Sequence, residues 1–217
     1  GWTDAPNAIT TPVSTGVLAF PAAAALAAVC NLLGVVCVTA VSDAVARTLW
    51  AIADFGPYAL TALTAALSAT VLWAVAAWRF GIPTSESHAL VAGLSGGALA
   101  LGPGCLRTGP LLWVGFGLVF SLLLGWALGR LFVRLLPPQG RSFYRHGQIL
   151  GAALTAFLHG AQDGQKFLGV LALILTLEGN KFSLPGWSPW GCAALMAIGT
   201  LVGGRRIVET VGEKMVR

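Results

Sequence analysis

Long apolar runs alternate with short polar stretches along the whole chain. Four of these runs carry no Asp, Glu, Lys or Arg and have about the 20 residues that a membrane-spanning helix requires. They cover residues 22–41, 57–78, 110–129 and 188–204. A helix satisfies its own backbone hydrogen bonds in lipid. The runs therefore predict an all-α polytopic membrane protein.

Three further segments are apolar but interrupted by polar residues or helix breakers. Residues 1–18 contain acidic, amide and proline positions, and residues 83–101 begin with the sequence Pro-Thr-Ser-Glu-Ser-His. Residues 147–177 hold a polar group near their middle, consisting of His159, Gln162, Asp163, Gln165 and Lys166. Irregular backbone at membrane depth is tolerated only where protein or a water-filled cavity surrounds it. We therefore expect these three segments to form broken or re-entrant helices.

The basic residues indicate how the helices are oriented. Four arginines and no acidic residue occupy the stretch after the third uncharged run, at Arg130, Arg134, Arg141 and Arg145. Lys and Arg concentrate in cytoplasmic loops, so this stretch is expected to be cytoplasmic. Counting the crossings from there, residues 1–18 run inward and residues 147–177 run outward.

Two of the interrupted segments resemble each other. Residues 1–7 (GWTDAPN) align with residues 160–166 (GAQDGQK), offset by 159 positions, with Gly and Asp in common. Similar units of opposite direction are typical of inverted-repeat transporters. We assign residues 1–141 to a first repeat with its connecting span, and residues 142–217 to a second, inverted repeat. A counterpart of Pro83 would fall near position 242, beyond the last residue. The first repeat is therefore expected to be incomplete at its N-terminus and the second truncated at its C-terminus.

The composition supports a membrane protein and excludes several other classes. Hydrophobic residues make up 56% of the 217 positions and charged residues only 10%, against about 25% charged in ordinary soluble domains. A disordered chain, a nucleic-acid-binding domain and nearly any water-soluble enzyme are excluded. The net charge of +5 is assigned to cytoplasmic loops, so no nucleic-acid partner is expected. The four cysteines show no C-x-x-C spacing, so they predict no metal or redox site.

Residues 83–88 have the features of a helix start inside the membrane. Proline suits the first turn of a helix, and Ser or Thr can cap it. A free helix N-terminus presents unpaired N–H groups and binds anions. The hydroxyls of Thr84, Ser85 and Ser87 would add donors for a tetrahedral oxyanion. The alternative interpretation is a capped loop at the surface.

Carboxylates in apolar segments indicate that a cation binds as well. A charged residue at the centre of a membrane helix costs about 2.5–3.5 kcal/mol. Asp4 and Asp163, together with Asn7 and Gln162, offer hard oxygen ligands for a small cation. A bound cation would screen the carboxylates from an incoming anion, which makes the two binding events mutually dependent, as in symport. The alternative is an internal salt bridge that only fixes helix packing.

Three motifs together resemble a known family. They are residues 1–8 (GWTDAPNA), 83–88 (PTSESH) and 159–166 (HGAQDGQK), with weaker similarity over residues 204–211. These resemble the signatures of the inorganic phosphate transporter (PiT) family, its bacterial members in particular. The resemblance implies an all-helical inverted-repeat fold and cation-coupled phosphate uptake in the bacterial inner membrane. It also implies lipid surroundings, a homodimer, and no cofactor other than a coupling ion.

The motifs depart from the family's commonest form at a few positions. Thr3 stands for the Asn of G-A-N-D, Gln162 and Lys166 stand for the Asn residues of H-G-A-N-D-x-Q-N, and Glu86 stands for a Thr. The resemblance therefore leaves both Na+ and H+ open as the coupling ion. Lys166 could take the place of a bound cation, and Glu86 could carry a proton.

On this basis the chain is expected to be a phosphate symporter and not an enzyme. The residues assigned to phosphate are Thr84, Ser85, Ser87, Gln162, Gln165 and Lys166. The residues assigned to the coupling cation are Asp4, Asn7, Asp163 and Glu86, with Na+ held by Asp4, Asn7 and Asp163.

Three other functions remain open at this point. Sulfate transport by the same architecture is the nearest, although a buried carboxylate acceptor favours phosphate, which donates hydrogen bonds near pH 7 whereas sulfate does not. An intramembrane hydrolase would pair Ser85 or Ser87 with His88 or His159, but no third group is evident to orient the base. A passive channel is the third.

Overall fold

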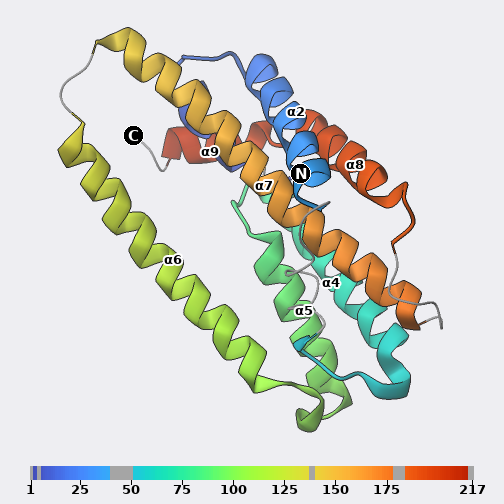
Figure 1. The fold of residues 1–217 in the computed structure, drawn as a ribbon. Helices are drawn as coiled ribbons and strands as arrows, with labels where there is room; N and C mark the ends of the chain where they lie inside the picture. Colours follow the sequence, from blue (N-terminus) through green and yellow to red (C-terminus); the bar gives the residue numbers. More distant parts are fainter. Residues whose placement is uncertain (1, 4–5, 40–50, 137–139, 178–183, 215–217) are drawn as a thin grey trace.

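The computed structural model describes residues 2–3, 6–39, 51–136, 140–177 and 184–214, and most of these residues lie in helices joined by short turns and extended stretches (Figure 1). A single isolated β-bridge joins Ala53 and Leu106. The all-α prediction is confirmed. The helices are α1 (Pro6–Ser14), α2 (Phe20–Thr39), α4 (Ala59–Phe80), α5 (Glu86–Leu101), α6 (Thr108–Leu135), α7 (Arg141–Leu177), α8 (Ser188–Val202) and α9 (Arg205–Lys214), with short 3-10 turns at Gly56–Tyr58 and Pro103–Cys105.

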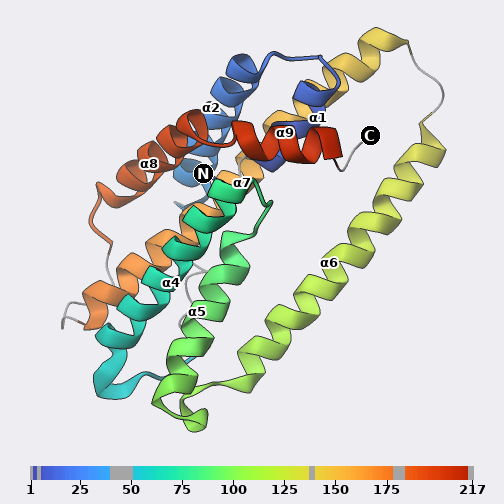
Figure 2. The same ribbon diagram turned by 180° about the vertical axis from the view of Figure 1, so that it is seen from behind.

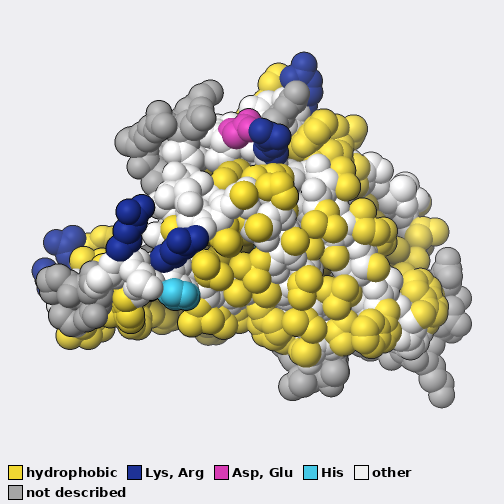
Figure 3. All heavy atoms as spheres, turned by 90° about the horizontal axis from the view of Figure 1, so that it is seen from above, with side chains coloured by type: hydrophobic (Ala, Val, Ile, Leu, Met, Phe, Trp, Pro, Cys, Tyr) yellow, Lys and Arg dark blue, Asp and Glu magenta, His cyan; other side chains and the backbone are white. Residues whose placement is uncertain are grey.

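The uncharged runs form the helices that the sequence predicts. Among the described residues, three segments are long and apolar enough to cross a membrane: Phe20–Val38, Gly56–Phe80 and Thr108–Leu135. The fourth run forms the shorter apolar helix Ser188–Val202. Seen from above, the surface is largely hydrophobic, with charged side chains at a few places only (Figure 3). Such a surface suits contact with lipid.

Helix α7 corrects one prediction. Residues 147–177 were expected to form a broken helix, but they lie within one continuous helix of 37 residues, about 55 Å long at 1.5 Å per residue. The segment contains no proline. Its polar residues His159, Asp163 and Lys166 are spaced four and three apart, and Gln162 lies three residues after His159, so all four lie towards one side of the helix. Polar groups on one face need no break in the backbone.

The other two interrupted segments each contain a shorter helix with non-helical residues beside it. The N-terminal segment forms the nine-residue helix α1 and then a turn at Gly16, whose φ of 70° suits glycine. Helix α4 ends at Gly81, also left-handed with φ 67°, and its N–H bonds to the carbonyls of Ala77 and Trp78. An extended stretch follows, and α5 begins at Glu86. The first turn of α5 lies beside the middle of α7, as the hydrogen bond from Lys166 to Ser87 shows.

Glycines let α2 and α7 cross in close contact. A Cβ atom on Gly160 would lie 2.6 Å from Cα of Asn31, and one on Gly34 would collide with the carbonyl of Phe157. The side chain of Asn31 also joins α2 to α8, because its Nδ2 donates to Oγ1 of Thr200 at 3.1 Å. Small residues at such crossings allow backbones to approach in membranes. The crossing fixes α7, which carries much of the polar site.

Helices α4 and α5 form a hairpin that packs against the second half of α7. Leu63 on α4, Leu90 on α5 and Val170 on α7 belong to one buried apolar cluster. Helix α6 stands apart from this group in both ribbon views, and it has no buried residue (Figure 1; Figure 2). Helix α9 packs against α1 with Ile207 and Val208 buried.

Candidate functional site

A polar cavity of about 260 Å³ lies where α1, the start of α5 and the middle of α7 meet. These three segments are far apart in the sequence and are the ones singled out for their polar residues. The side chains and backbone that line the cavity belong to Asn7, Ala8, Thr84, Ser85, Ser87, Thr155, His159, Gln162 and Asp163. The structure therefore brings six of the predicted site residues to one space: Asn7, Thr84, Ser85, Ser87, Gln162 and Asp163.

The start of α5 presents hydroxyl groups to this cavity. Ser85 precedes the helix in an extended conformation, with φ −110° and ψ 115°, and its side chain makes no capping hydrogen bond. The cap allowed for in the sequence is thus not formed, and the Ser85 hydroxyl lines the cavity with that of Ser87. The N–H groups of the first turn of a helix are not bonded within that helix. Hydroxyl and helix N-terminus together make this wall suited to an anion.

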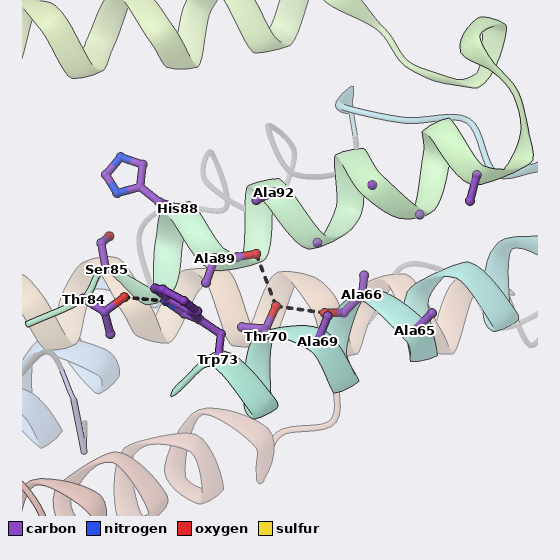
Figure 4. Close-up of a pocket in the computed structure, with 14 residues that line it drawn as sticks. Ala65, Ala66, Ala69, Thr70, Trp73, Thr84, Ser85, His88, Ala89 and Ala92 are labelled. Atoms are coloured by element: carbon purple, nitrogen blue, oxygen red, sulfur yellow. Dashed lines mark hydrogen bonds between the residues drawn. The ribbon is translucent and has the colours of Figure 1, made fainter. Parts of the chain in front are cut away.

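Thr84 is held in place by an aromatic residue of α4. The indole Nε1 of Trp73 donates a hydrogen bond to Oγ1 of Thr84 at 2.7 Å (Figure 4). The Thr84 hydroxyl accepts this bond, so its own hydrogen can be donated elsewhere. Thr84 and Ser85 also line a larger, mainly apolar pocket of about 720 Å³ between α4 and α5, shown in Figure 4. These two residues therefore separate a polar space from an apolar one.

A buried ion pair forms part of the cavity wall through Asp163. Nζ of Lys166 donates to Oδ1 of Asp163 at 2.6 Å and also to the hydroxyl of Ser87. Lys166 is 9% exposed and Asp163 is 2% exposed. One ammonium therefore links α7 to the start of α5 and compensates the carboxylate. The salt bridge considered from the sequence exists, and it lies within the polar site.

His159 lies on the other side of Asp163. Its Nε2 atom is 3.4 Å from Oδ2 of Asp163, but the two groups are not aligned for a hydrogen bond. Within the described part of the chain, both atoms are buried without any hydrogen-bond partner. Buried polar atoms of this kind are rare unless a ligand or water serves them. Oδ2 of Asp163 and Nε2 of His159 are therefore available to bind a ligand in the cavity.

Sequence analysis missed two members of the cavity. His159 was considered only as a hydrolase base, and Thr155 was not singled out, yet both line the cavity. Thr155, His159 and Asp163 follow each other at intervals of four along α7, so they lie on one face. This periodicity, read upstream from Asp163, could have identified both.

Other predicted site residues lie elsewhere or cannot be placed. The carboxylate of Glu86 accepts a hydrogen bond from the Thr3 hydroxyl and lines a separate, mainly apolar pocket of about 520 Å³ beside α8. Gln165 is buried but does not line the polar cavity. Asp4 lies outside the described residues. In the part of the chain that the structure describes, no group of three or more His, Cys, Asp or Glu side chains could hold a metal ion.

Comparisons with known proteins agree on one family. The sequence model of the phosphate transporter family matches residues 1–139 and 136–217. The whole chain is 37% identical to a probable low-affinity inorganic phosphate transporter of Rhizobium meliloti and 31% identical to one of Bacillus subtilis, and it covers 68% of each of those proteins.

A more distant relative is the low-affinity inorganic phosphate transporter PitA of Escherichia coli. It is 30% identical over 81% of this chain and 42% of its own length. No solved structure matches the chain.

Proposed function

The chain belongs to the phosphate transporter family, and on that premise we propose that its polar cavity binds inorganic phosphate during transport across the membrane. A member of this family is a transporter and not an enzyme, so the hydrolase interpretation is set aside. The family and the apolar helices place the chain in a membrane, and its relatives are bacterial.

One observation carries the proposal: three hydroxyl side chains and the start of α5 converge on one cavity. Thr84, Ser85 and Ser87 can each donate a hydrogen bond to a phosphate oxygen. The N-terminus of α5, a helix of 16 residues, adds unpaired N–H groups and a partial positive charge. Gln162 supplies an amide from the facing helix α7. These groups match the acceptor oxygens of a tetrahedral anion.

The charge balance around the cavity also supports an anion. Asp163 would repel phosphate, but the Lys166 ammonium lies 2.6 Å from its carboxylate. The pair has no net charge, so an anion can approach this wall. Lys166 does not line the cavity, so it affects phosphate binding indirectly, through its hydrogen bonds to Ser87 and Asp163. Gln165 is buried on α7 but does not line the cavity, so its assignment to phosphate stays a prediction.

We propose that transport is a symport driven by Na+ or H+. Asn7 and Asp163 line the same cavity as the phosphate hydroxyls, which favours linked binding of a cation and an anion. The assignment of Asp4, Asn7 and Asp163 to a mobile cation stays a prediction, as does Glu86 as a proton carrier.

Uptake into proteoliposomes tests the proposal. Purified protein is reconstituted, and uptake of radiolabelled phosphate is followed with Na+ and pH gradients imposed one at a time. Concentrative uptake under one gradient, with no uptake into protein-free liposomes, is expected. Equilibration without concentration would indicate a passive pore. Concentrative uptake of sulfate and not of phosphate would favour the sulfate alternative.

A further inference from the structure

The two oxygens of the Asp163 carboxylate have different surroundings. Oδ1 accepts a hydrogen bond from Nζ of Lys166 at 2.6 Å. Oδ2 has no hydrogen-bond partner among the described residues, although the side chain is almost fully buried and lines the polar cavity. A buried acceptor that stays unpaired costs about 1–3 kcal/mol, and more when it is charged. The unpaired oxygen is therefore available to a ligand in the cavity.

The protein's own described groups do not provide a donor for Oδ2. Lys166 is bonded to the other oxygen and to Ser87. The Nε2 atom of His159 is 3.4 Å from Oδ2 but is not aligned for a hydrogen bond. An ionised carboxylate only accepts hydrogen bonds. A ligand in the cavity that carries an O–H or N–H group would supply the missing donor, and a bound cation is the alternative partner.

Inorganic phosphate carries such a group and sulfate does not. Near neutral pH, phosphate exists as two ions that both retain at least one P–O–H group, whereas sulfate has lost its protons. We propose that Oδ2 of Asp163 accepts a hydrogen bond from the P–O–H group and thereby selects protonated oxyanions over sulfate. The inference rests on the proposed function, because it assigns the substrate contact made by Asp163 in the same cavity.

Lys166 makes this contact compatible with a negatively charged substrate. Without the ammonium, Asp163 would face the anion as an uncompensated charge. With it, the pair is neutral, and Oδ2 keeps its capacity as an acceptor. A site built to bond a substrate hydroxyl discriminates strongly against an analogue that lacks it. Asp163 is then a determinant of specificity as well as a part of the ion pair.

Monofluorophosphate and sulfate are the probes for this proposal. At neutral pH, monofluorophosphate has the double negative charge of hydrogen phosphate, with fluorine in place of the hydroxyl group. Binding of radiolabelled phosphate to the purified protein is measured in competition with each anion. Unlabelled phosphate is expected to compete at least about tenfold more strongly than either probe, as the loss of one hydrogen bond to a charged group implies.

Variants of Asp163 extend the test. Asp163→Asn can place an N–H₂ donor at the position of the Oδ2 acceptor, and such a donor cannot accept a hydrogen bond from the P–O–H group. The preference for phosphate over both probes is therefore expected to fall to about threefold or less. Asp54→Asn is the matched control, because Asp54 is exposed and pairs with Arg107 at 3.2 Å, away from the cavity. Should Asp163→Asn fail to fold, Asp163→Asn with Lys166→Met removes both charges together.

The outcomes separate this inference from the proposed function. If the unaltered protein binds phosphate but binds monofluorophosphate and sulfate equally well, the inference is overturned and the proposed function stands. If it binds no phosphate, the proposed function itself fails. If Asp163→Asn keeps the preference for phosphate and abolishes only a dependence on Na+, then Oδ2 serves a cation, and the inference is again overturned.

Discussion

Lys166 and Asp163 lie one turn apart on α7 and form a buried ion pair with 2.6 Å between Nζ and Oδ1. Removing one partner of such a pair typically costs about 3–5 kcal/mol, because the other is left as an uncompensated buried charge. The pair adjoins the cavity through Asp163 and Ser87. Its charges are therefore expected to govern both the stability of the site and its affinity for ions.

The first prediction concerns Lys166→Asn. Without the ammonium, the Asp163 carboxylate repels phosphate unless a cation binds beside it. We expect a lower phosphate affinity and an uptake rate that rises more steeply with the driving cation. Uptake at fixed phosphate, measured against Na+ concentration and separately against pH, checks both effects.

Arg205→Gln is the control for that variant, since it also removes one positive charge. Arg205 is exposed and pairs with Glu209 on α9, outside the cavity. It should leave affinity and cation dependence unchanged. If Lys166→Asn behaves like this control, Lys166 has no part in ion binding and is only a structural partner of Asp163.

The second prediction compares two serine variants. Ser85 lines the cavity, whereas Ser121 is exposed on α6 and donates to the carbonyl of Leu118. A hydrogen bond to a charged group contributes about 1.5–3 kcal/mol, so Ser85→Ala should weaken phosphate binding roughly ten- to a hundredfold. Ser121→Ala should not change it. Equal affinities in isothermal titration would remove Ser85 from the site.

The third prediction tests the crossing of α2 and α7. A methyl group on Gly160 would overlap the backbone of Asn31, whereas one on Gly151, earlier on the same helix, meets no atom within 4 Å. Overpacking typically costs about 1–3 kcal/mol, so Gly160→Ala should lower the melting temperature in detergent. Gly151→Ala should leave it unchanged or raise it, because Ala favours a helix over Gly by about 0.5–1 kcal/mol. A thermal shift series on both variants would show whether the crossing is as tight as its geometry indicates.

The fourth prediction concerns Glu86. Its carboxylate accepts a hydrogen bond from Thr3 and lies in the apolar pocket beside α8, not in the polar cavity. Glu86→Gln should therefore keep phosphate affinity within about twofold, because affinity changes little where no direct hydrogen bond is lost. Uptake driven by a pH gradient should be reduced, since the amide cannot carry a proton. A large loss of phosphate affinity would instead place Glu86 in direct contact with the substrate.

The helices were largely predictable because lipid leaves the backbone few options. Uncharged runs of sufficient length became α2, α4, α6 and α8. The prediction of a break in α7 is wrong because polar residues need not interrupt a helix, and His159, Asp163 and Lys166 share one face of it. Whether such a face meets lipid or a polar cavity depends on α1 and α5, which are distant in sequence.

The polar site was predictable in part for a similar reason. Ser85 and Ser87 line the cavity, but Glu86 between them does not. Ser85 is extended and precedes α5, so the motif passes from extended to helical backbone and its side chains follow no single period. The motif includes all three without showing which way each points. Thr155 lies outside the motifs, and it reaches the cavity because it shares a face of α7 with His159 and Asp163.

The helix contacts around the cavity differ in how they respond to displacement. At Gly34 and Gly160, backbone meets backbone, and a small slide would drive atoms into overlap. Between the α4–α5 hairpin and α7, the contact is made by Leu63, Leu90 and Val170, whose side chains have alternative rotamers. Sliding is therefore much stiffer at the first contact than at the second. If the cavity widens, the α4–α5 hairpin would therefore move relative to α7, while α2 and α7 would move together as a rigid body.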